Sequence, residues 1–185
     1  MRLFIGIPMP EELKQKLLAS QKQIEKLCDI KLVEPENLHF SLKFIGEVNE
    51  DRVKEIREVL TSAAEKFSAF ALSIAGIGAF PSAGSARVVW AGCSAGAKEL
   101  EALAGFIDSE LSKVGFAGEE RLFRAHLTLG RIRQLENNPA LQKFISGNKE
   151  KDFGSFRVSK ISLIESELSP HGSTYIEIFS VDLHE

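Results

Sequence analysis

The spacing of apolar residues along the chain predicts an alternation of strands and helices. Between residues 50 and 67, Val53, Ile56, Leu60 and Ala63 recur every three or four positions, which is the period of an amphipathic helix. Asn49 stands where an N-cap is expected. The same criteria predict strands at 2–7, 38–45, 70–77, 87–91, 124–132, 153–168 and 175–183, and helices at 10–28, 50–67, 97–114 and 139–146.

The order of these elements repeats. After the first strand, the series helix, strand, helix, strand, strand occurs twice, in halves running approximately from residue 10 to 92 and from 97 to 183. No Gly-, Ser- or Pro-rich linker separates the halves, so we expect one bilobal domain over residues 1–185. The predicted fold class is α+β with an internal duplication: two lobes, each an antiparallel sheet with flanking helices, and an active-site groove between them.

A tetrapeptide also repeats, and it carries the candidate chemistry. His39-Phe40-Ser41-Leu42 opens one predicted strand, and His126-Leu127-Thr128-Leu129 lies in the equivalent one. Alternate side chains of a strand share a face, so His39 and Ser41 point together, as do His126 and Thr128. Phe40, Leu42, Leu127 and Leu129 then point into the core. Each lobe thus presents one imidazole and one hydroxyl to the groove.

This arrangement suits acid–base chemistry on a phosphate diester. Imidazole changes its charge near neutral pH, so one histidine can take a proton while the other gives one. The two hydroxyls can donate hydrogen bonds to phosphate oxygens. Which histidine is the acid and which is the base does not follow from the pattern.

Four other residues qualify as weaker candidates. Arg124 has the strand parity of His126 and could contact phosphate. Arg131 has the opposite parity, so it reaches the phosphate only if a bulge at Gly130 re-aims it; otherwise it is a surface residue. Phe80, expected in a loop before Pro81, could stack on a base. Lys43 shares the parity of His39, but a solvated lysine at the strand end is the simpler interpretation.

Two alternatives to catalysis follow from the same residues. A lone histidine in a strand is usually structural, and the duplication could have copied a structural histidine. Two histidines could also begin a zinc site, but no third ligand lies near either tetrapeptide. We therefore expect neither a metal nor another cofactor.

Composition, net charge and cysteine content exclude several classes of protein. The 185 residues are 44% hydrophobic and 26% charged, as in ordinary globular domains. The net charge of −3 argues against coating of long nucleic acid, although residues 121–133 hold four arginines and no acid. Cys28 and Cys93 form neither a disulfide framework nor a metal motif. No apolar run is long enough for a membrane span. Because the two cysteines suit a reducing compartment, we expect a cytoplasmic protein. We also expect a monomer with no obligate protein partner.

The sequence resembles the two-histidine (2H) phosphoesterases, and among them the LigT-like RNA 2′,3′-cyclic phosphodiesterases, historically called 2′-5′ RNA ligases. The resemblance extends almost from end to end through residues 2–7, 36–47, 80–81, 87–92, 123–131 and 166–175. The chain has Ser41 where many members have Thr, which preserves the hydroxyl. It has Ala125 where a proline often precedes the second histidine.

The resemblance implies a specific reaction on RNA ends or small cyclic nucleotides. His39 would donate a proton to the leaving 3′ oxygen, and His126 would accept one from water, giving a 2′-phosphomonoester without a metal. Run in reverse, the same groups would join a 2′-phosphate or cyclic phosphate end to a 5′-hydroxyl. Two alternatives remain open: a phosphodiesterase for another cyclic or 2′-5′-linked nucleotide, and a nucleotide- or RNA-end-binding module without turnover.

Overall fold

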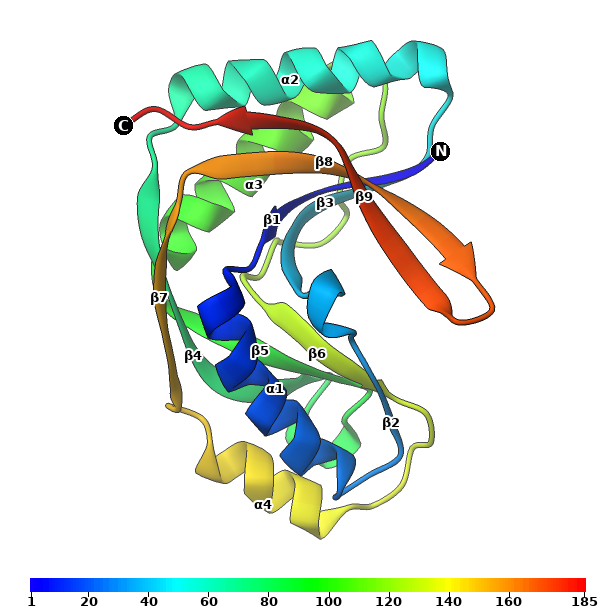
Figure 1. Cartoon of the computed structure of the whole chain (residues 1–185), viewed down its shortest axis with the longest axis vertical. Helices are drawn as coiled ribbons and strands as arrows, with labels where there is room; N and C mark the ends of the chain where they lie inside the picture. The colour runs from blue at the N-terminus through cyan, green and yellow to red at the C-terminus, as the bar shows by residue number, and fades with distance from the viewer.

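The computed structural model describes residues 1–185 and contains four helices and nine strands, shown in Figure 1. The strands are β1 (Arg2–Pro8), β2 (Ile30–Leu32), β3 (His39–Glu47), β4 (Phe70–Phe80), β5 (Val88–Ala95), β6 (Leu127–Ile132), β7 (Asp152–Val158), β8 (Lys160–Ser169) and β9 (Gly172–Asp182). The helices are α1 (Glu11–Glu25), α2 (Val53–Lys66), α3 (Ala97–Lys113) and α4 (Pro139–Gly147).

The strands form two antiparallel sheets, which confirms the predicted α+β class. One sheet has four strands in the order β3-β1-β8-β9, and the other has five in the order β2-β6-β5-β4-β7. Each sheet takes strands from both halves of the sequence. In the four-stranded sheet β1 pairs with β8, and in the five-stranded sheet β4 pairs with β7 and β5 with β6. The two lobes are therefore not the two consecutive halves of the chain.

The helices pack on the sheets in pairs (Figure 1). Helices α2 and α3 pack against the four-stranded sheet, while α1 and α4 pack against the five-stranded sheet. The apolar stripe predicted for the second helix is confirmed, because Val53, Ile56, Leu60 and Ala63 of α2 are all buried. One continuous hydrophobic core joins both lobes.

Two expectations for the fold need correction, and one strand was not predicted. The strand expected at 153–168 is two strands, because the chain crosses from one sheet to the other at Ser159; the buried residues Val158 and Ile161 stand three apart, which breaks the alternation of a single strand. The short edge strand β2 was not predicted. Asn49 makes no capping hydrogen bond through its side chain, since a 3₁₀ turn at Glu50–Arg52 precedes α2.

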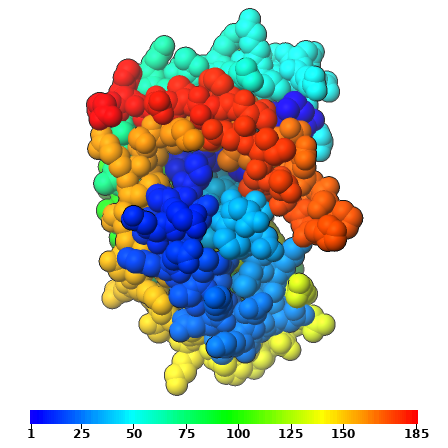
Figure 2. All heavy atoms as spheres, viewed as in Figure 1, coloured from blue at the N-terminus to red at the C-terminus, as the bar shows by residue number.

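The β8–β9 hairpin is the most prominent surface feature. Its tip, orange in Figure 2, projects from the body of the molecule. Leu168, near the tip, is two-thirds exposed. The hairpin forms one wall of the groove described below. None of the helices combines the length and apolar character needed to span a bilayer.

Candidate active site

The open faces of the two sheets enclose a groove of about 540 Å³. Its lining includes five residues that the sequence singled out, namely His39, Ser41, His126, Thr128 and Arg131. Both tetrapeptides thus face one cavity from opposite sheets. Their apolar members are buried, with Phe40, Leu42, Leu127 and Leu129 at most 4% exposed, as the strand parity predicts.

The His39 ring is held by hydrogen bonds at both nitrogens. Its Nδ1 lies 2.5 Å from the carbonyl oxygen of Asn37, and its Nε2 lies 2.9 Å from Ser41 Oγ. Because a carbonyl oxygen only accepts, Nδ1 carries a proton, and Nε2 is the atom that gains or loses the second one. Asn37 in turn contacts the β8–β9 hairpin, because its Nδ2 donates a hydrogen bond to the carbonyl oxygen of Ser173, 2.7 Å away.

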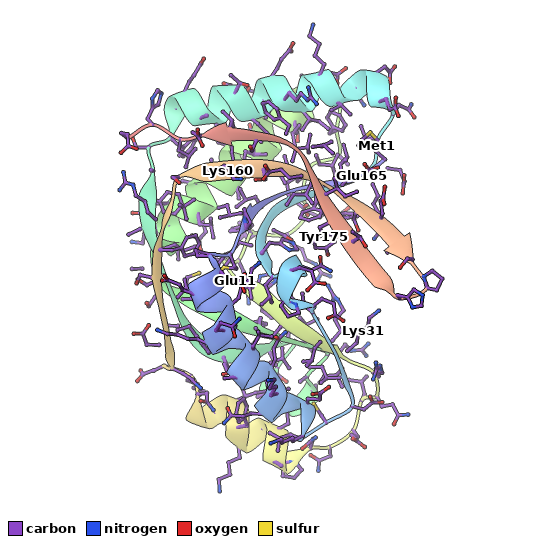
Figure 3. The ribbon with its side chains drawn as sticks, viewed as in Figure 1. Met1, Glu11, Lys31, Lys160, Glu165 and Tyr175 are labelled. Atoms are coloured by element: carbon purple, nitrogen blue, oxygen red, sulfur yellow. The ribbon has the colours of Figure 1, made fainter.

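Aromatic rings and a glycine enclose His39. Its ring centroid lies 4.7 Å from that of Phe4 and 5.1 Å from that of Tyr175, which is labelled on β9 in Figure 3. A Cβ on Gly6 would lie 3.3 Å from His39 Cδ2 and 2.9 Å from the Phe40 carbonyl oxygen, so the ring needs glycine beside it. Burial lowers the pKa of His39 below its ordinary 6.5, although the hydrogen bond to Asn37 opposes this.

His126 has an equivalent arrangement immediately before β6, because the strand expected from residue 124 begins only at Leu127. Its Nδ1 lies 2.7 Å from the carbonyl oxygen of Arg124, again two residues earlier in the chain. The ring stands edge-on to Phe80, with centroids 5.1 Å apart. Its Nε2 makes no hydrogen bond within the protein, so this nitrogen is available to a ligand in the groove.

A bulge in β3 explains an incorrect expectation. Gly6 pairs with Ser41 but Ile5 pairs with Lys43, so β3 carries one extra residue at Leu42. The bulge turns Lys43 to the helix side, where its side chain is 3% exposed rather than solvated. Lys43 Nζ lies 2.7 Å from Asp108 and 3.3 Å from Glu119, which ties β3 to α3 and to the loop before His126.

A second bulge decides the orientation of Arg131. Trp90 pairs with Thr128 but Val89 pairs with Gly130, so β6 also carries one extra residue between those two pairs. Strand parity is reversed beyond it, and Arg131 faces the groove together with Thr128. Of the two interpretations that the sequence left open, the structure contains the bulge that re-aims Arg131, although its extra residue is Leu129 rather than Gly130.

The groove is cationic although the chain as a whole is acidic. No Asp or Glu side chain lines it, whereas Arg2 and Arg131 both do. Burial raises the pKa of the Tyr175 hydroxyl, while the positive charges of Arg131 and Arg2 act in the opposite direction. Both guanidinium groups therefore act on the same small volume, and an anionic group is the ligand that it favours.

Sequence reasoning missed Arg2 and Tyr175. Arg2, Phe4 and Gly6 alternate along β1, and on this side of the strand Arg2 and Phe4 line the groove while Gly6 lies beside His39. The alternation of these three residues is visible in the sequence, but only the pairing of β1 with β3 shows that they lie near His39. Tyr175 of β9 contacts His39 and lines the groove.

Arg124 and Phe80 lie outside this groove. Both line an adjacent cavity that also includes His126. Phe80 is the last residue of β4 rather than a loop residue, and its ring packs on Trp90, with centroids 5.1 Å apart. The structure assembles no group of three or more His, Cys, Asp or Glu side chains suited to holding a metal ion.

Comparison with known proteins places this geometry in a family. The LigT-like phosphoesterase model matches the chain twice, at residues 7–90 and 92–175, which confirms the internal duplication. A relative named RNA 2′,3′-cyclic phosphodiesterase from Methanocaldococcus jannaschii is 39% identical over 175 residues, covering 95% of this chain and 96% of the relative. A relative of the same name from Archaeoglobus fulgidus is 36% identical over 178 residues, covering 96% and 98%.

Solved structures have the same fold. A crystal structure of a Thermus thermophilus protein superposes with a TM-score of 0.84 at 26% identity, covering 99% of this chain and 98% of that one. Escherichia coli LigT complexed with 3′-AMP superposes with a TM-score of 0.82 at 23% identity, covering 100% and 98%. The family matches span most of the residues and include both tetrapeptides, and the chain therefore belongs to the LigT-like phosphoesterases.

Proposed function

We propose that this protein hydrolyses RNA 2′,3′-cyclic phosphodiester ends to 2′-phosphomonoesters by two-histidine acid–base catalysis without a metal. The observation that carries the proposal is the pair of imidazoles with equivalent Nδ1 anchors, facing one acid-free groove from opposite sheets. The name shared by relatives at 36% and 39% identity supports RNA ends as the substrate class.

The proposed step moves two protons. Neutral His126 accepts a proton at Nε2 from the attacking water, whose oxygen forms the new bond to phosphorus. The bond between phosphorus and the 3′ oxygen breaks, and His39, protonated at Nε2, donates its proton to that oxygen. Exchange with solvent then restores the two charge states. The assignment of donor and acceptor follows the family resemblance.

The remaining groove residues would stabilise charge on the phosphate. Ser41 and Thr128 can each donate a hydrogen bond to a non-bridging oxygen, one from each sheet. Arg131 and Arg2 add positive charge at the same groove. A 5′-hydroxyl in the place of water would give a 2′-5′ linkage, which is the ligation that the older family name describes.

Turnover in the presence of a chelator tests the proposal. We expect hydrolysis of a 2′,3′-cyclic mononucleotide to continue unchanged in excess EDTA, because His39 and His126 supply both proton transfers. The product position, determined by chromatography against 2′- and 3′-phosphate standards, should be 2′. Binding without turnover would favour a non-catalytic module. Activity lost in EDTA and restored by zinc or manganese would contradict the metal-free step.

The pH dependence of turnover should be bell-shaped, because one histidine must be charged while the other is neutral. His39 must be charged to donate a proton, and its pKa lies below 6.5, so the donor form disappears as pH rises through that lowered value. We expect kcat/KM to fall at both low and high pH, with two apparent pKa values that belong to the coupled pair of histidines. The check is kcat/KM for a cyclic mononucleotide over a full pH series.

Tyr175→Ala provides the control for this pH profile. Removing the ring that packs against His39 exposes the imidazole to water, which raises its pKa toward the ordinary value. One limb of the bell should therefore move to higher pH in this variant. A wild-type rate that rises steadily into the alkaline range would contradict the two-histidine step altogether.

A further inference from the structure

A second cavity continues from the groove across the open face of the five-stranded sheet. It measures about 650 Å³ and shares His126 with the groove. Thr128 of β6 pairs with Trp90 of β5, which pairs with Gly78 of β4. Paired residues project to the same face, so this cavity, here called the sheet trough, extends from the candidate site toward the edge of the sheet.

The floor of the sheet trough is aromatic. A Cβ on Gly78 would lie 2.2 Å from the indole carbon Cζ2 of Trp90, and one on Gly92 would lie 3.1 Å from Cζ3. The indole therefore lies on the backbone of these two glycines, while Trp90 remains partly exposed to the trough. Phe80 packs beside it and contacts the His126 ring, so three rings follow one another out of the groove.

Charged groups border these rings. Arg124 and Lys149 line the trough and are exposed, and neither has an ion-pair partner. Glu101 of α3 is the single carboxylate in the lining. Aromatic platforms beside positive charges are the arrangement that binds single-stranded nucleic acid, because bases stack on the rings while phosphates lie near the cations.

We propose that the sheet trough binds the nucleotides immediately upstream of the reacting end, with a base stacked on Trp90. This inference rests on the proposed function. A cyclic phosphate stands at the 3′ end of an RNA, so the rest of the strand must leave the groove on one side. The trough begins at His126, offers the rings and cations that such a strand requires, and is large enough for a base and its ribose.

The experiment compares substrates of different length. In the wild-type protein, kcat/KM should be about ten- to a hundredfold higher for a trinucleotide ending in a 2′,3′-cyclic phosphate than for the cyclic mononucleotide, as expected for one stacked base. Trp90→Leu should reduce this length ratio to near one. Lys149→Ala should reduce it about two- to fivefold, whereas Lys143→Ala, which changes a lysine of α4 outside the trough, should leave it unchanged.

Fluorescence provides an independent measurement on the unaltered protein. Trp90 is the only tryptophan of the chain, so its emission reports on the trough alone. A trinucleotide ending in a 2′-phosphate should quench this emission, and a 2′-phosphate mononucleotide should not. This readout does not depend on turnover or on the folding of a variant.

The outcomes separate the two proposals. Hydrolysis of the mononucleotide together with a wild-type length ratio near one, or with no quenching by the trinucleotide, would overturn the trough and leave the proposed function standing. A length ratio that survives Trp90→Leu would also overturn it. Quenching by the trinucleotide without turnover of either substrate would support the trough and refute the proposed hydrolysis.

Discussion

Replacing either candidate histidine is expected to remove most of the phosphodiesterase activity. In His39→Ala the leaving 3′ oxygen departs without a proton, and in His126→Ala the water must attack without a base. Loss of one such group typically lowers the rate by about 10²–10⁴-fold. The measurement is kcat/KM for a 2′,3′-cyclic mononucleotide with each single variant.

The double variant makes this test more specific. Because the two proton transfers belong to one step, His39→Ala combined with His126→Ala should be little worse than the more impaired single variant. His184→Ala is the matched control, since this exposed histidine near the C-terminus lies outside the groove. Thermal unfolding of each variant separates loss of chemistry from loss of fold. Near-normal turnover by either single variant would refute the two-histidine step.

The two hydroxyls are expected to produce the second largest effect. Ser41→Ala and Thr128→Ala each remove one hydrogen bond to a phosphate oxygen that gains charge in the transition state. A hydrogen bond to a charged group is worth roughly 1.5–3 kcal/mol, so each variant should lose about 10–150-fold in kcat/KM. Both losses should be smaller than those of the histidine variants.

The structure adds an asymmetry between the two hydroxyls. Ser41 Oγ lies 2.9 Å from His39 Nε2, whereas Thr128 makes no such contact with His126. Ser41→Thr retains the hydroxyl and is the matched control, with kcat/KM close to that of the wild type. Full activity in Ser41→Ala would mean that this hydroxyl has a structural role only.

Much of the fold could be predicted from local patterns of apolar and polar residues. The helix predicted at 50–67 followed from its apolar spacing and is observed at Val53–Lys66, and the duplication followed from the repeated order of elements. The order of the strands within the two sheets could not be predicted, because a strand's partner depends on contacts across the whole chain. The crossing from β7 to β8 at Ser159 is the clearest case, since a three-residue spacing of buried positions is too weak a signal by itself.

In the candidate site, too, some features followed from the sequence and others only from the tertiary structure. Two-residue alternation within each tetrapeptide determined that His39 points with Ser41 and His126 with Thr128, because that geometry is internal to one strand. Only the tertiary structure decided that Arg131 turns toward the groove and Lys43 away from it, and that Arg2 and Tyr175 join the histidines there. The reason is physical: a bulge is a mismatch of register between two paired strands, so it reverses side-chain directions in a way that the sequence of one strand does not contain.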